Sequence, residues 1–424
     1  MSDAPLSPPG GSGRIASIDA LRGLTILVMI FVNDIAGVPG TPAWMEHFRT
    51  INPDGSINWY ADGMTFVDWV FPSFLFIVGM AIPFAIGRRM DQGVPLSKIW
   101  GHILVRTLGL LIIGFFMVNA HDANPLINRH LWNVLMYLCV ILVWSVAPKD
   151  PGPKRTAYLV MKIIGALGLI ALAALYRHES GIWMRTHWWG ILGLIGWAYL
   201  VACIAYTLFR HSQMAMLGVA ALLYCLFMAD RVGTFEGLYL APGFRVKEWI
   251  DIGSMLGSHA AITISGVVLG MILTQQSPVR GHWPRMRWAL VYGAGLWIAG
   301  WLLYQLHGIH DMFIINKNAA TVPWCLISSA YTVWIWVAIY WVMDVMQLKR
   351  WAIVIRPGGE NPLFAYILHP MLVHLFALLA LAGLTFWADL GSGFATGFWR
   401  SLFIAFAVVW LSGGLKRVGV WLRL

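Results

Sequence analysis

The residues best suited to chemistry in this sequence lie in and beside one polar segment, Ile35–Asp62, between two long apolar runs. His47 is the sharpest candidate, because a neutral imidazole can act as a base or as a nucleophile that accepts an acyl group. Asn33 and Asp34 end the first apolar run and Asp68 lies one turn inside the second, so these groups can meet at one end of a hairpin. The predicted catalytic residues are therefore His47, Asn33, Asp34 and Asp68.

These residues also admit ordinary structural interpretations. A single histidine in a loop is usually solvated, and a carboxylate in the first turn of a helix, as at Asp68, complements the helix dipole. Against this, ionisable groups at membrane depth are costly to insert, and this hairpin holds several of them, including Asp19 and Arg22. A hairpin with a purely structural role rarely carries so many ionisable residues, so we treat the hairpin Arg14–Met80 as the functional part of the molecule.

A second polar group stands just before the tenth apolar run, in the order Asn316, Lys317, Asn318. A cation flanked by two amides suits a polar ligand, or a carbonyl oxygen that develops negative charge during a reaction. A loop lysine that reaches lipid headgroups explains the same pattern about as well. We predict a substrate or oxyanion site from these three residues and leave the structural alternative open.

Four arginines stand at the opposite ends of the first three apolar runs. Arginine binds phosphate through two parallel N–H groups, so such a cluster suits an anionic cofactor. The tendency of membrane proteins to carry Lys and Arg in cytoplasmic connections explains the same positions without any ligand. The candidate cofactor-binding residues are Arg22, Arg88, Arg89 and Arg106.

The remaining histidines and the four cysteines show no metal motif. His259 and His369 lie inside apolar runs, where hydrogen bonds between helices account for them. The cysteines also fall inside apolar runs, without a CxxC spacing, which is typical of small core residues. We expect no metal ion in this protein.

The composition places all of these residues in an integral membrane protein. The chain of 424 residues is 59% hydrophobic and 11% charged, with a mean hydropathy of +0.70, whereas soluble domains carry about 25% charged residues. The apolar runs are continuous and about 20 residues long, which indicates helices rather than the strands of a barrel. The expected fold is an all-α polytopic bundle of about twelve transmembrane helices, with about ten as the lower bound. The candidate spans are 18–36, 65–87, 100–118, 130–147, 157–175, 187–209, 213–230, 255–275, 287–306, 321–345, 362–384 and 397–415.

The charges between these spans indicate the orientation. Alternate connections, counted from the N-terminus, hold about twice as many Lys and Arg residues as the others, which places both termini in the cytoplasm. The net charge of +10 arises from these scattered residues, so no nucleic-acid partner is expected. Residues 1–13 are expected to form a disordered tail, and residues 14–424 a single transmembrane domain.

Five motifs in this chain carry a family resemblance. They read SIDALRGLT at Ser17–Thr25, FVN at Phe31–Asn33, DGMTFVDWVFPSFLFIVG at Asp62–Gly79, INKN at Ile315–Asn318 and GENPLFAYIL at Gly359–Leu368. Together they resemble bacterial relatives of the lysosomal heparan-α-glucosaminide N-acetyltransferase, and the nearest group looks like the NagX-type bacterial proteins. The resemblance covers most of the chain and implies a transmembrane acyltransferase of the bacterial inner membrane.

The resemblance also implies a reaction and assigns roles to residues. It implies that acetyl-CoA supplies an acetyl group from the cytoplasmic side and that an amino sugar accepts it on the far side. The family's essential histidine lies in the outer loop, where His47 is the histidine of this chain, and Asn33 matches the asparagine that accompanies it. In the lysosomal enzyme the histidine stands shortly before the glycine that matches Gly63. Asn58 occupies that place here, so the role passes to His47 across an insertion.

Two other functions fit the sequence. A transporter for an amino sugar would also have many spans, polar residues inside the membrane and helices interrupted by proline, as at Phe71–Pro72. The absence of a visible inverted repeat and the arginine cluster favour the enzyme. The third candidate is an O-acyltransferase that acts on a surface glycan. The expected partners are a lipid bilayer and an amino-sugar or glycan acceptor, while a homodimer is left open.

Overall fold

The computed structural model describes residues 15–121, 123, 125–148, 152–178, 180–186, 188–417 and 421–422. The tail expected at residues 1–13 lies outside the described residues. Within them the chain is helical almost throughout, and the named strands form two short antiparallel hairpins. These hairpins pair β1 (Thr50–Ile51) with β2 (Ile57–Asn58) and β3 (Tyr239–Ala241) with β4 (Phe244–Arg245). The predicted all-α fold is confirmed.

Each of the predicted spans coincides with a helix. Ten helical segments of the described chain are long and apolar enough to cross a membrane, within the predicted range. The other two are α5 (Arg129–Trp144), which is shorter, and α10 (His282–Tyr304), whose first turns carry Arg285 and Arg287. The ten are α1 (Ala16–Ile35), α2 (Val67–Ile82) with η2 (Pro83–Gly87) and α3 (Arg88–Asp91), α4 (Leu96–His121), α6 (Pro153–Leu175), α7 (Ile191–Phe209), α8 (Gln213–Arg231), η4 (Ile252–Ser258) with α9 (His259–Leu273), α11 (Val322–Tyr340) with η6 (Trp341–Val345), α13 (Pro362–Leu381) and α15 (Phe394–Arg417).

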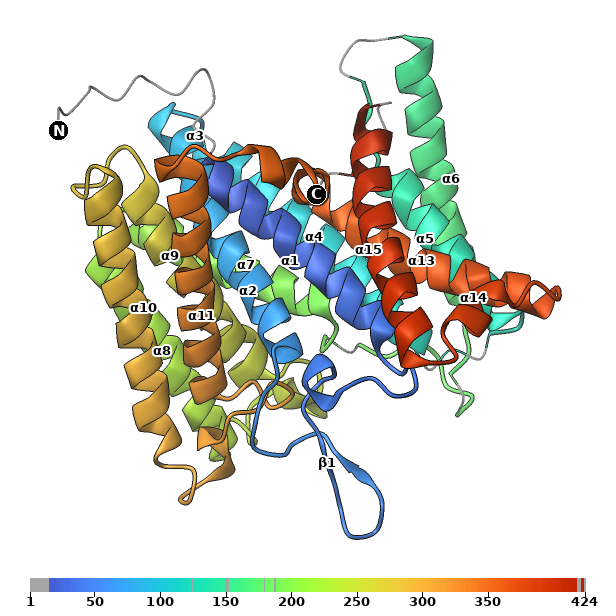
Figure 1. Ribbon diagram of the computed structural model, residues 1–424, viewed down its shortest axis with the longest axis horizontal. Helices are drawn as coiled ribbons and strands as arrows, with labels where there is room; N and C mark the ends of the chain where they lie inside the picture. Colours follow the sequence, from blue (N-terminus) through green and yellow to red (C-terminus); the bar gives the residue numbers. More distant parts are fainter. Residues whose placement is uncertain are drawn as a thin grey trace.

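Helix α1 stands in the middle of the bundle (Figure 1). On one side it packs against α12 (Arg356–Glu360), α13 and α15, with α5 and α6 beyond them. On the other side it packs against α2, which contacts α9 and α11, and α4, α7, α8 and α10 complete that group. The remaining short elements are η1 (Ala43–Met45), η3 (Val246–Glu248), η5 (Asp311–Phe313), η7 (Arg350–Ile353) and α14 (Phe386–Leu390).

The bundle has two distinct ends. Helix α1 begins and helix α15 ends at the upper end of Figure 1, where α3 also lies. The β1–β2 hairpin projects from the lower end. We call these the terminal end and the hairpin end.

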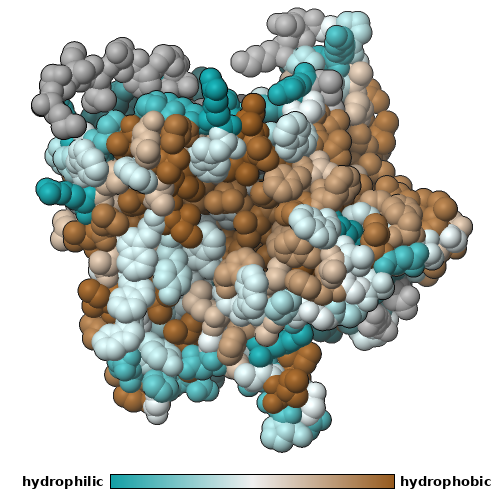
Figure 2. Space-filling view, in the orientation of Figure 1, coloured by the Kyte–Doolittle hydropathy of each residue, from teal (hydrophilic) through white to brown (hydrophobic). Residues whose placement is uncertain are grey.

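The surface of the bundle matches a bilayer. Hydrophobic residues dominate the middle of the face shown in Figure 2, and hydrophilic residues gather along its upper and lower edges. Helices α4 and α6 expose aliphatic side chains such as Leu104, Leu108, Leu159 and Leu167. Continuous helices that satisfy their own backbone hydrogen bonds and show apolar side chains outward are what a bilayer requires. A lipid bilayer is therefore the environment of this multi-pass membrane protein.

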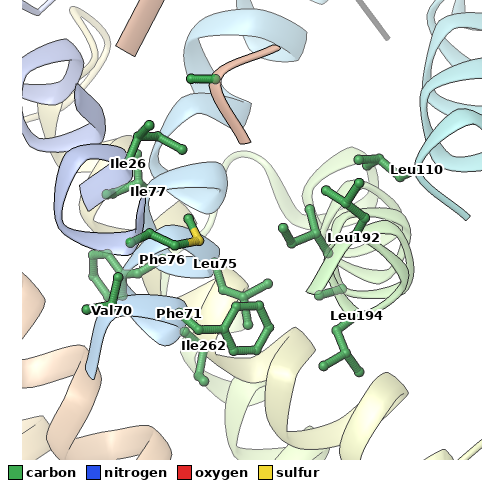
Figure 3. Packing of buried hydrophobic residues seen from close by; sticks show 14 of the residues in the cluster. Ile26, Val70, Phe71, Leu75, Phe76, Ile77, Leu110, Leu192, Leu194 and Ile262 are labelled. Atoms are coloured by element: carbon green, nitrogen blue, oxygen red, sulfur yellow. The ribbon is translucent and has the colours of Figure 1, made fainter. Parts of the chain in front are cut away.

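Small residues let α2 and α9 approach closely. A methyl group at Gly79 of α2 would overlap the carbonyl oxygen of Thr263 in α9, and one at Gly266 of α9 would overlap that of Phe76 in α2. Figure 3 shows the apolar packing around this contact, with Phe71 of α2 beside Ile262 of α9. Helices in a membrane associate through such van der Waals contact, because lipid tails are as apolar as the side chains themselves.

The start of α1 is held in a similar way. A methyl group at Gly23 would overlap the carbonyl oxygen of Ile355, and one at Gly359 of α12 would come within 2.5 Å of the carbonyl oxygen of Asp19. Two motifs that are far apart in the sequence, the one that begins at Ser17 and the one that begins at Gly359, are thus pressed together at the terminal end.

Replacing Gly266 by alanine should weaken the bundle. The added methyl group forces α2 and α9 apart, and overpacking of this kind costs about 1 to 3 kcal/mol. The matched control is Gly218→Ala in α8, where the new methyl group meets no atom within 4 Å. We expect a lower thermal unfolding midpoint in detergent for Gly266→Ala and an unchanged or higher one for Gly218→Ala. Equal midpoints for the two variants would contradict the close contact.

Candidate active site

The centre of the site is a contact between the outer loop and α2. His47 Nδ1 lies 2.8 Å from Asp68 Oδ1. Because a carboxylate only accepts hydrogen bonds, Nδ1 carries the proton and Nε2 keeps a lone pair. Asp68 is buried in the first turn of α2, whereas the side chain of His47 is 37% exposed. The imidazole is therefore oriented to accept a proton or an acyl group at Nε2.

Asp68 also holds the loop around His47. The backbone N–H groups of Phe48 and Thr65 both donate to Asp68 Oδ2, at 3.0 Å each. The hydroxyl of Thr65 in turn donates to the carbonyl oxygen of Glu46 at 2.6 Å. A single buried carboxylate thus receives hydrogen bonds from both sides of the loop, and this fixes the ring of His47 against the end of α2.

Lys317 completes the group. Its Nζ lies 3.1 Å from both ring nitrogens of His47, so the ammonium lies against the face of the imidazole. Burial lowers the pKa of Lys317 to about 8, while the negative charge of Asp68 opposes this shift. The ammonium is therefore a charged donor at neutral pH that can lose its proton in mildly alkaline solution.

The polar segment before α11 reaches His47 because it is attached to the loop that precedes α2. The side-chain amide of Asn316 donates to the carbonyl oxygens of Trp59 (3.0 Å) and Ala61 (2.9 Å). The N–H of Gly63 donates to the carbonyl oxygen of Ile315 at 2.8 Å. Asn316 is buried and anchors the two segments, and Lys317, the next residue, projects towards the histidine.

His47 and Lys317 line a cavity of about 1070 Å³. Asn33 of α1 and Asn318 also line it, together with His47 and Lys317. The exposed lining residues, such as Tyr60, lie at the hairpin end, so the cavity opens there. Its deeper wall is apolar and aromatic. That wall includes Met29, Val70, Phe71, Leu192, Leu194 and Met255.

Asp34 does not face this cavity. Its buried carboxylate accepts hydrogen bonds from Ser401 Oγ (2.7 Å), Arg400 Nη2 (3.2 Å) and His369 Nε2 (3.3 Å). Arg400 Nη2 also donates to the backbone carbonyl oxygen of Asp34 at 3.1 Å. This cluster attaches the last turn of α1 to α13 and α15, and it leaves Asn33 as the residue of the pair that lines the cavity.

The four arginines lie apart from His47, towards the terminal end. Arg22 contacts Asp19 at 3.4 Å. On α3, Arg88 is exposed and Arg89 half-buried. The guanidinium of Arg106 lies 4.6 Å from the ring centre of Tyr199, and its Nε is buried without a hydrogen-bond partner among the described residues. The structure therefore does not join the arginines and His47 into one site.

The cavity is also lined by residues to which the sequence assigned no catalytic or binding role. The segment Lys247–Asp251, which leads into η4, forms part of one wall, and the aromatic pair Trp188–Trp189 forms another. Ser254 and His259 line the cavity from η4 and α9. No local motif marks these residues, because they come together only through the packing of α4, α7 and α9.

The chain is similar in sequence to one protein family and to two named acetyltransferases. A family model described as "Domain of unknown function (DUF5009)" matches residues 14–239. A heparan-alpha-glucosaminide N-acetyltransferase of Mus musculus is 30% identical over 393 residues, which cover 86% of this chain and 54% of that protein. The Homo sapiens protein of that name is 31% identical over 108 residues, 26% of this chain and 14% of that protein. The chain therefore spans about half the length, or less, of these relatives.

Removing the carboxylate of Asp68 should release the loop that carries His47. In Asp68→Ala the donors at Phe48 and Thr65 lose their partner, which costs about 1 to 3 kcal/mol and raises the open population about 5- to 150-fold. Trypsin should then cleave after the exposed Arg49 correspondingly faster than in the unsubstituted protein. Asp389→Ala, which removes an exposed carboxylate from α14, serves as the control. An unchanged cleavage rate in Asp68→Ala would show that Asp68 does not hold the loop.

Proposed function

We propose, from the premise that this chain belongs to the DUF5009 family, that it is a membrane acetyltransferase acting between acetyl-CoA and the amine of an amino sugar. The observation that carries the proposal is the contact of His47 with both Asp68 and Lys317 in the wall of a large cavity. The similarity to a heparan-alpha-glucosaminide N-acetyltransferase over 86% of the chain supports the type of reaction and the kind of acceptor.

His47 is the residue that acts on the reacting atoms. In the reaction a C–N bond forms, the C–S bond of the thioester breaks, and the departing thiolate takes up the proton lost by the amine and leaves as the thiol. Asp68 keeps the proton on Nδ1, so Nε2 is the reactive atom. Nε2 either removes the proton of the attacking amine, or takes the acetyl group itself and passes it to the amine. Both routes require the same tautomer of His47.

Lys317 stabilises the negative charge that develops on the carbonyl oxygen during attack. Its ammonium is already in place and half-buried, so it needs little reorganisation, and Asn33 and Asn318 offer further N–H donors in the same cavity. The ammonium lies 3.1 Å from Nε2 of His47, so it stands beside the atom that reacts with the acyl donor.

The distribution of charge supports a direction across the membrane. We place the protein in the bacterial inner membrane with the terminal end in the cytoplasm, as expected of NagX-type proteins and of the excess of Lys and Arg. The donor then enters past Arg22, Arg88, Arg89 and Arg106. The buried Nε of Arg106 lacks a partner among the described residues and suits a phosphate oxygen. Along α1, Arg22 and Asn33 lie about 16 Å apart, which the arm of the donor must cover.

Replacing His47 by alanine should abolish acetyl transfer. The assay follows radiolabelled acetyl groups from acetyl-CoA to glucosamine in proteoliposomes, and loss of a general base or nucleophile lowers the rate about 100- to 10,000-fold. Asp54→Ala, at the exposed tip of the same loop, is the matched control and should retain the full rate. If His47→Ala were as active as the control, the proposed role of His47 would be wrong. Uptake of unmodified glucosamine without acetylation would support a transporter instead.

The pH dependence should identify the part played by Lys317. Its pKa of about 8 means that the ammonium is present below pH 8 and is lost as the pH rises through that value. We therefore expect the rate to fall above about pH 8. In Lys317→Arg the guanidinium stays charged, so the alkaline decline should move to higher pH, although the overall rate is lower.

Both proteins are compared with the same amine, so titration of the acceptor cancels. An alkaline decline at the same pH in Lys317→Arg would assign it to another group. Lys317→Met should be slow at every pH, because it removes the charge altogether.

A further inference from the structure

His259 lines the cavity but has no role in the reaction proposed above. It is the first residue of α9, it is 5% exposed, and it lines the cavity. Its Nδ1 lies 2.7 Å from the backbone carbonyl oxygen of Ser254. Because a carbonyl only accepts, Nδ1 carries the proton and Nε2 has a free lone pair. Nε2 has no hydrogen-bond partner among the residues that the structure describes.

The ring of His259 packs beside those of Phe71 and Trp324, with centre-to-centre distances of 5.6 Å and 6.3 Å. The histidine also follows directly on a π-helical turn, η4, a feature often found at functional sites. Aromatic side chains thus hold the ring, while Nε2 remains available to a donor group in the cavity that His259 lines.

The depth of His259 indicates which ligand this is. Trp324 Nε1 donates to the backbone carbonyl oxygen of Asp68 at 3.3 Å, and the ring of Trp324 also packs beside that of His259. Phe71 follows Asp68 by three residues on α2, and this places it about 4.5 Å farther from the hairpin end. His259 packs against Phe71, so it lies deeper in the membrane than the first turn of α2, which holds His47.

We propose that His259 is a positioning residue for the acyl donor, whose nearest amide N–H donates a hydrogen bond to Nε2 while the thioester carbon lies at His47. This inference rests on the proposed function. In an acyl-pantetheine donor that amide nitrogen is four bonds from the thioester carbon, which an extended chain covers in about 5 Å. The amide therefore trails the thioester by about 5 Å, on the side of the terminal end, where His259 lies. An arm that enters from the terminal end passes His259 before its thioester reaches His47.

Two small acetyl donors test the inference directly. N,S-diacetylcysteamine carries the amide, and S-butyl thioacetate lacks it but has a comparable length. The loss of one neutral hydrogen bond corresponds to about a 3- to 10-fold change. We expect the unsubstituted protein to use N,S-diacetylcysteamine with a kcat/KM higher by this factor, once the ratio is corrected for the intrinsic reactivity of each thioester with free amine.

Two polar variants separate the acceptor from the structural role of the ring. The amide of His259→Asn reaches the position of Nδ1, so it keeps the hydrogen bond to Ser254 but loses the acceptor at Nε2. The amide oxygen of His259→Gln reaches the position of Nε2. We expect the preference between the donors to vanish in His259→Asn and to persist in His259→Gln, mainly through KM. His282→Asn, at a half-buried histidine outside the cavity lining, should keep the preference.

The outcomes distinguish this inference from the function on which it rests. If the unsubstituted protein transfers acetyl groups from acetyl-CoA but treats both small donors alike, the positioning role is wrong. It is equally wrong if His259→Asn retains the preference. If no acetyl group passes from acetyl-CoA to any amine in the unsubstituted protein, the proposed function itself fails.

Discussion

The buried carboxylate of Asp68 is the constraint on which the site depends. A charge in the first turn of a membrane helix is tolerated only when donors surround it, and here they come from His47, Phe48 and Thr65. Satisfying the carboxylate therefore brings the outer loop onto the end of α2 and orients the imidazole. Lys317, from the segment before α11, contacts His47 beside this carboxylate. Three distant parts of the sequence therefore meet at Asp68.

The helices were predictable from the sequence because each is a long apolar run, and the hairpin was predictable because it gathers charge between two of them. The neighbours Asn33 and Asp34 show where such reasoning ends. Successive residues on a helix point about 100° apart, so the two side chains cannot share one direction. Asn33 faces the cavity while Asp34 faces Arg400 and Ser401, and only the packing of α15 decides which is which.

The same limit applies to the segment Asn316–Asn318. Its sequence suggests two amides that flank one cation, but the buried Asn316 is used by the carbonyl oxygens of Trp59 and Ala61, and Lys317 alone reaches His47. His259 was even harder to predict, because a single histidine in an apolar run is usually explained by a hydrogen bond within or between helices. One such bond exists at Nδ1. Only the structure shows that His259 also lines the cavity, where Nε2 is available to a ligand.

The close packing of α2 and α9 gives these separate observations a common physical basis. The glycines at 79 and 266 let each helix backbone touch the other, so the two helices form one closely packed unit. Asp68 and Phe71 belong to α2, and His259 belongs to α9, so this unit fixes the distance between the two proposed contact points of the donor. Lys317 instead comes from the loop before α11 and lies against His47. In the proposed reaction α2 and α9 position the donor, while the ammonium of Lys317 is already in place for the negative charge that develops.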